Sequence, residues 1–103
     1  MADNKAMTAL ADPTRRKIFE LVAARPRSVA DLTRALPVSQ SAVSQHLKVL
    51  RDAKLVRAEA KGASNIYRID PAGLEQMRAW LDQQWGRALD EFKSDIEKQE
   101  KKR

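Results

Sequence analysis

The polar residues of the stretch "VSQSAVSQHLKVL", residues 38–50, have types and a spacing suited to hydrogen bonding. On a helical wheel Val43, Leu47 and Leu50 fall within about 60° of one another, which predicts one buried stripe. The opposite face carries short hydroxyls, amides and one cation, where an ordinary solvated helix would alternate Glu and Lys. Its members are Ser41, Gln45 and Lys48, with Ser44 at the edge.

This face matches the chemistry of a DNA major groove. Hydroxyls and amides both donate and accept hydrogen bonds, as do the mixed edges of the base pairs. Gln45 suits adenine, and Lys48 suits guanine or phosphate. Gln40 and Ser41 lie in the first turn, whose free backbone N–H groups favour phosphate. The competing interpretation, from this helix alone, is a solvated face of low charge.

His46 is the only histidine and lies beside the buried stripe, which favours a packing or phosphate-adjacent role over metal binding. A metal site needs three or four ligands, and the chain has no second histidine and no cysteine. No nucleophile–base pair and no glycine-rich phosphate loop is present either, so we expect no enzyme activity and no cofactor.

Composition supports a soluble protein with an anionic partner. The chain has 103 residues, 43% of them hydrophobic, and a formal net charge of +6. This balance favours one globular domain that binds an anionic molecule. The absence of cysteine excludes disulfides and thiol nucleophiles. No apolar run is long enough to span a membrane and the N-terminus does not resemble a signal peptide, so we expect a cytoplasmic protein.

Several short helices must position the polar face. We predict helices over residues 4–11 and 13–24, the second opened by Asp12-Pro13. A capping box from Ser28 to Asp31 opens a third helix that runs to about Leu36, and Ser39 caps the helix with the polar face. Two helices joined by this tight connection predict a helix-turn-helix over residues 28–52.

A β-hairpin follows over residues 56–69, where the apolar period changes to two. Gly62 allows a positive φ at its tip, and Lys61, with Arg57 or Arg68, is placed to meet phosphates or a minor groove. Exposed hairpins also carry Lys and Arg merely to protect their edges, which is the competing interpretation.

A second phosphate clamp is predicted at Arg15, Arg16 and Lys17, because cations at a helix N-terminus repel the helix dipole unless an anion compensates them. The predicted DNA-binding set is Ser39, Gln40, Ser41, Ser44, Gln45, His46, Lys48, Arg16, Arg57 and Lys61.

The last predicted helix covers residues 71–98 and is too long for one small domain to cover its apolar stripe. A second copy of the chain would supply the missing surface. We interpret Trp80 and Trp85 as part of this dimer core, with a ligand pocket between protomers as the alternative. The predicted dimer interface comprises Met7, Leu10, Leu74, Met77, Leu81, Trp85 and Phe92.

From "ALADPTRRKIFELV" through "SVADLTRALPVSQSAVSQHLKVLRDAKLVRAEAKGASNIYRID", the chain resembles the ArsR-type bacterial repressors. The resemblance covers residues 6 to about 92, and "SQSAVSQHLKVLRDAKLV" is its most specific part. It implies a homodimer, paired through the first and last helices, that binds an inverted-repeat operator and often regulates its own operon. The metal sensors of the family carry Cys-Val-Cys-Asp-Leu where this chain has Ser28-Val29-Ala30-Asp31-Leu32, which implies a metal-blind branch.

The sequence therefore predicts one domain over residues 1–103, mainly α with a small β-hairpin, of the winged helix-turn-helix class. We expect a sequence-specific DNA-binding transcriptional regulator that represses as a homodimer on double-stranded DNA, without a membrane partner. A winged helix for protein–protein contact and a sequence-indifferent DNA binder are the alternatives. The sequence identifies neither an operator nor an inducer.

Overall fold

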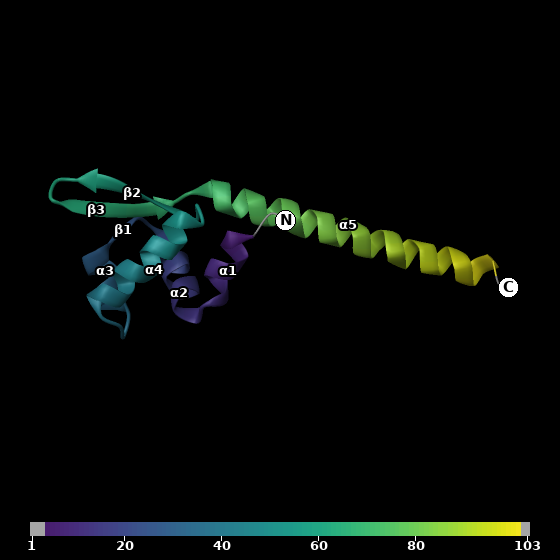
Figure 1. The fold of residues 1–103 in the computed structure, drawn as a ribbon, viewed down its shortest axis with the longest axis horizontal. Helices are drawn as coiled ribbons and strands as arrows, with labels where there is room; N and C mark the ends of the chain where they lie inside the picture. The colour runs from purple at the N-terminus through teal and green to yellow at the C-terminus, as the bar shows by residue number, and fades with distance from the viewer. Residues whose placement is uncertain (1–3, 102–103) are drawn as a thin grey trace.

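The computed structural model describes residues 4–101. Figure 1 shows a small helical body with a hairpin along one side and one long helix projecting from it. The elements are α1 (Lys5–Ala11), α2 (Pro13–Ala24), β1 (Arg27–Ser28), α3 (Val29–Ala35), α4 (Gln40–Asp52), β2 (Val56–Lys61), β3 (Ser64–Ile69) and α5 (Pro71–Lys101).

Side-chain caps begin α2, α3 and α4 where the sequence predicts them. Asp12 Oδ1 accepts the backbone N–H groups of Thr14 and Arg15, at 2.8 and 3.0 Å. Ser28 and Asp31 form a reciprocal capping box. Ser39 Oγ accepts the backbone N–H of Ala42 at 3.1 Å. Each cap satisfies backbone donors that have no partner within the helix, so helix starts can be read from local sequence.

The predicted two-stranded wing is part of a three-stranded antiparallel sheet, in the order β1-β3-β2. Strand β1 was not predicted; it pairs Arg27 with Tyr67 and Ser28 with Ile66. A two-residue strand is too short to show a period of two, and it forms only because β3 lies beside it. The hairpin itself is confirmed, with Val56 opposite Ile69 and Lys61 opposite Ser64.

The core lies between the sheet and the helices, and α4 crosses it. The buried stripe predicted on α4 is confirmed, since Val43, Leu47 and Leu50 are each at most 1% exposed. Other helices, the turn after α4 and the start of β2 complete the core with Ala6, Ala9, Ile18, Val22, Leu32, Ala53, Leu55 and Val56. Because this stripe is packed into the core, the opposite face of α4 is fixed toward the solvent.

A tight corner joins α4 to the rest of the chain. Lys54 adopts a φ of 59°, and its N–H donates to Arg51 O at 3.0 Å while Leu55 N–H donates to Leu50 O at 3.0 Å. This pair of bonds is a Schellman motif, which satisfies the last carbonyls of a helix. The N–H of Gly73, in the first turn of α5, then donates to Lys54 O at 2.7 Å.

Helix α5 extends far beyond the body and runs to Lys101, three residues past its predicted end. The radius of gyration is 19.2 Å, against about 13 Å for a compact chain of 100 residues. The molecule measures 71 × 25 × 24 Å, because the outer part of α5 packs against no other described element of its chain.

Candidate nucleic-acid interface

The outward face of α4 presents one continuous polar surface. Ser44, Gln45 and Lys48 lie on it, with Ser39, Gln40 and Ser41 at the start of the helix, and all six residues are exposed. The fold therefore brings together six of the ten residues predicted to bind DNA. The Ser39 hydroxyl also caps the helix, so its oxygen already accepts one hydrogen bond.

His46 lies apart from this face, half-buried on the side of α4 that approaches the N-terminus of α2. The nearby carboxyl of Asp12 has a lowered pKa, chiefly because it accepts a hydrogen bond from the backbone N–H of Arg15, and His46 is the smallest contributor to that lowering. This position suits the packing or phosphate-adjacent role predicted for His46 better than base contact.

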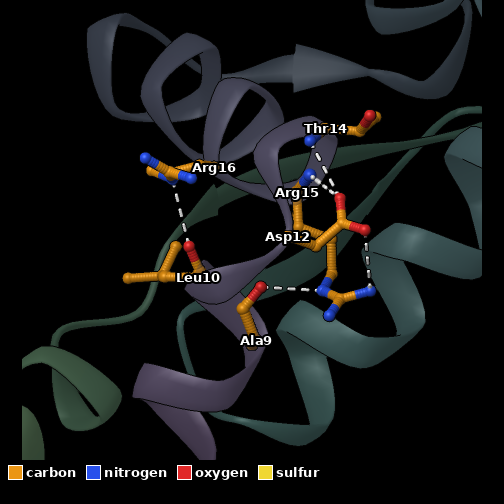
Figure 2. Close-up of polar contacts among 6 residues, drawn as sticks. All are labelled: Ala9, Leu10, Asp12, Thr14, Arg15 and Arg16. Atoms are coloured by element: carbon orange, nitrogen blue, oxygen red, sulfur yellow. Dashed lines mark hydrogen bonds and ion pairs between the residues drawn. The ribbon is translucent and has the colours of Figure 1, made fainter.

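Two of the three cations in the predicted clamp at the start of α2, Arg15 and Arg16, donate hydrogen bonds within the chain, as Figure 2 shows, while Lys17 is exposed. Arg15 donates from Nε to Ala9 O at 2.7 Å and pairs with Asp12 at 3.9 Å, leaving its side chain 19% exposed. Asp12 thus supplies the compensating anion that was expected from DNA. Arg16 donates from Nε to Leu10 O at 3.1 Å but is otherwise exposed, so it stays a candidate for phosphate contact.

The two predicted DNA contacts of the wing, Lys61 and Arg57, lie at different ends of the hairpin. Lys61 is exposed at the tip, beside Gly62 with its φ of 63°. Arg57 lies opposite Arg68 near the base of the hairpin and points away from the face on which the neighbouring Val56 is buried. Lys61 therefore lies at the wing tip, and Arg57 lies near the base of the hairpin on the side of the sheet away from α4.

Two hollows border β3, one beside α4 and the other beside the start of α3 and the first residue of α4. The larger measures about 470 Å³ and is lined by Ser44, Lys48, Arg51, Asp52 and Tyr67. The smaller lies near the wing tip, measures about 200 Å³ and is lined by Gln40, Ser64 and Asn65 with the start of α3. Arg51 and Tyr67 were absent from the predicted set. The spacing of Arg51, seven residues after Ser44, signals the same side of the helix, but nothing in the sequence places Tyr67 beside it.

The predicted dimer residues fall into two groups. Leu10, Leu74 and Met77 pack against the chain's own core. Met7, Leu81, Trp85 and Phe92 form the exposed group, with exposed fractions of 37%, 53%, 66% and 63%. The second group therefore offers most of the apolar surface that a partner could cover.

Two further features bear on the class of protein. Among residues 4–101, no three His, Cys, Asp or Glu side chains are grouped so that they could hold a metal ion. Within the same described range, each helix is either too short or too polar to cross a membrane.

Comparison with known proteins now places the chain in a family. The model for "Bacterial regulatory protein, arsR family" matches residues 12–58. The HTH-type transcriptional regulator Rv2034 of Mycobacterium tuberculosis is 51% identical over 86 residues, which cover 84% of this chain and 80% of that protein. The chain belongs to the bacterial arsR family of regulatory proteins. The resemblance seen in the sequence is thereby confirmed.

A further relative and a solved structure are also described as transcriptional regulators. The transcriptional repressor SdpR of Bacillus subtilis is 28% identical over 78 residues, covering 76% of this chain and 87% of that protein. The structure titled "Possible transcriptional regulator for arsenical resistance" superposes with a TM-score of 0.72 at 40% identity, covering 88% of this chain and 95% of the other.

A homodimeric winged helix-turn-helix DNA-binding domain from Mycobacterium bovis, a possible ArsR-family regulator, gives a TM-score of 0.64 at 27% identity. That match covers 76% of this chain and 72% of the other. The arsR-family protein described here has a winged helix-turn-helix fold and is a DNA-binding transcriptional regulator, not an enzyme. The predicted fold class and general function are confirmed, and a winged helix that only binds proteins is not favoured.

Proposed function

We propose that the chain is a homodimeric repressor that binds an inverted-repeat operator, with α4 of each protomer in a major groove. The observation that carries this proposal is the outward face of α4, where exposed hydroxyls, amides and a lysine lie on a helix whose other face is fully buried. Such side chains recognise base edges, and a rigidly packed helix holds them in a fixed register.

The apolar stripe of α5 supports the homodimer. Leu81, Trp85 and Phe92 are each more than half exposed on a helix that projects from the body. A contiguous exposed apolar surface of this kind marks an interaction site. The family relative from Mycobacterium bovis is itself homodimeric, which makes a second copy of the same chain the partner best supported. Two symmetric copies would read half-sites a whole number of turns apart, each turn about 10–10.5 base pairs.

Repression follows when a dimer occupies DNA that the polymerase needs. SdpR, a relative in the same family, is a transcriptional repressor. We propose the same direction of control for this chain, exerted in the cytoplasm and extending to its own operon. No inducer is assigned.

Selection of duplexes from a random library tests the proposal, because the operator sequence need not be known in advance. The enriched sequences should contain an inverted repeat. Fluorescence anisotropy at about 150 mM salt should then show binding at least about 1,000-fold tighter than to a scrambled duplex. Equal affinity for both duplexes would remove sequence recognition and leave a binder guided by charge alone.

A further inference from the structure

The groove between α4 and β3, named here the α4–β3 groove, has walls rich in groups that bind anions. Lys48 and Arg51 supply two cations, while Ser44 and Tyr67 supply two hydroxyls. Cations and hydroxyl donors together are the side chains that contact phosphate oxygens in protein–DNA complexes. The groove therefore has the chemistry of a backbone site rather than of a base site.

The lining residues are aligned along both walls. On α4, Gln40, Ser44, Lys48 and Arg51 are spaced by 4, 4 and 3 residues, which places them in one row along the helix. On β3, Asn65 and Tyr67 are two residues apart and so lie on the same face of the strand. The larger hollow lies between these rows, and the smaller one, near the wing tip, is bordered by Gln40 and Asn65 together with the start of α3.

Duplex geometry indicates what passes between the two walls. The major and minor grooves of DNA are separated by a single sugar–phosphate strand. With α4 in a major groove and the wing tip at the adjacent minor groove, that strand has to cross the space between helix and hairpin.

We propose that the α4–β3 groove holds this phosphodiester strand, with Arg51 and Tyr67 as phosphate-binding residues beside Lys48 and Ser44. The guanidinium of Arg51 and the hydroxyl of Tyr67 donate to non-bridging phosphate oxygens. This inference rests on the proposed placement of α4, and it assigns two residues outside the predicted DNA-binding set.

Asp52 provides a second test, because its substitution is expected to change DNA affinity in the opposite direction. Asp52, the last residue of α4, also lines the groove. A negative charge there repels phosphate, so it weakens binding to every duplex without altering the choice of sequence. Asp52→Asn is therefore expected to tighten binding, whereas the substitutions of Arg51 and Tyr67 weaken it.

The test compares Arg51→Gln and Tyr67→Phe with Arg78→Gln, which makes the same charge change on α5, where Arg78 is 84% exposed. Arg51→Gln should lower the slope of log affinity against log salt by about 0.9. Tyr67→Phe keeps the ring and removes one donor to a charged group, so affinity should fall about tenfold. Both variants should keep the wild-type ratio between selected and scrambled duplexes, and Arg78→Gln should bind as wild type does.

A chemical substitution in the DNA locates the contact. Duplexes carrying one neutral methylphosphonate in place of a phosphate are titrated, linkage by linkage, with wild-type protein and Arg51→Gln. Wild-type binding should weaken at one linkage in each half-site, and Arg51→Gln should be insensitive at that linkage alone.

The outcomes separate the two proposals. If wild-type protein prefers the selected duplex but Arg51→Gln keeps its full salt slope and its sensitivity at every linkage, the groove proposal is overturned while operator recognition stands. The groove proposal is also overturned if Tyr67→Phe binds as wild type does, or if Asp52→Asn does not tighten binding. If wild-type protein has no sequence preference, the proposed function fails instead.

Discussion

At Gln45 the structure places an amide in the middle of an exposed face, between Ser41 one turn earlier and Lys48 one turn later. Because this side chain is exposed, it adds little to the packing that holds the fold together. Its amide presents one acceptor and two donors, which is the pattern that pairs with the N6 and N7 atoms of adenine. A residue in this position can change DNA binding without changing stability.

Gln45→Ala should therefore weaken binding to the selected operator by about 1–3 kcal/mol and relax the preference at one base pair per half-site. Anisotropy titrations on a set of single-base operator variants measure both effects. Thermal unfolding of the same variant should match wild type. Unchanged discrimination at every position would show that this amide does not read a base.

Asp12 is a residue whose charge matters to stability rather than to DNA. Backbone hydrogen bonds from Arg15 and Thr14 hold the pKa of its carboxyl below the ordinary value for aspartate. A carboxyl with a lower pKa in the folded state adds stability above the unfolded pKa, and that stability is lost as the pH falls through the folded pKa. The same holds for Asp31, whose lowered pKa comes first from the backbone N–H that Ser28 donates to it.

Asp12→Asn keeps a capping oxygen but has no charge to titrate. Its Tm should be below that of wild type near pH 7, and the difference should shrink as the pH falls below about 4. Circular dichroism melts from about pH 7 to about pH 3 provide the comparison, with a second series on Asp31→Asn. A Tm difference that stays constant over the whole range would contradict the assigned role of the charge.

At the scale of elements, the corner between α4 and α5 brings two segments of backbone into close contact. A Cβ added at Gly73 would lie 2.6 Å from the carbonyl oxygens of both Ala53 and Lys54. Those atoms belong to the backbone of the Schellman motif and cannot move aside without breaking it. Gly73 is therefore needed for close approach, whereas Gly86, in the middle of the same helix, has nothing within 4 Å of its missing side chain.

Gly73→Ala should destabilise the fold by about 1–3 kcal/mol, because the added methyl group is overpacked against backbone. Gly86→Ala is the matched control, and it should stabilise α5 by about 0.5–1 kcal/mol. Urea unfolding of both variants gives the comparison. Equal stability of the two alanine variants would mean that α5 can shift away from the corner at no cost.

The elements also show what the sequence could and could not predict. The starts of α2, α3 and α4 and the buried stripe of α4 were predictable, because caps and helical periods are local properties. Strand β1 depends on its pairing with β3, which is distant in the chain, and so it had no local signal. The α4–β3 groove could not be predicted for the same reason, since Tyr67 lies beside Ser44 only after the sheet has packed on α4.

At the scale of the whole molecule, the shape supports the proposed homodimer. The outer part of α5 projects away from the body, yet it carries Trp85 and Phe92, which are 66% and 63% exposed. A large aromatic side chain exposed on a single helix gains little from packing in its own chain, so in the proposed homodimer these two residues would contribute by packing against the second copy. Helix length and the apolar stripe were enough to predict this exposed surface from the sequence.

Trp85→Ala should raise the dissociation constant of the dimer by about 30-fold or more, which is the usual loss at a buried interface tryptophan. Gln83→Ala, on the polar side of α5, is the control and should leave the dimer intact. Sedimentation equilibrium measures both, and circular dichroism should show that each variant keeps its helices. A dimer that tolerates Trp85→Ala would place the contact between protomers elsewhere.

The Lys54–Gly73 hydrogen bond ties the base of α5 to the end of α4, so the direction of α5 is fixed at this corner. A helix of 31 residues is about 46 Å long, so a pivot of about five degrees at its base moves the far end by roughly 4 Å. In the proposed homodimer, a slight tilt at the far end of α5 would therefore change the orientation of the two α4 helices relative to each other.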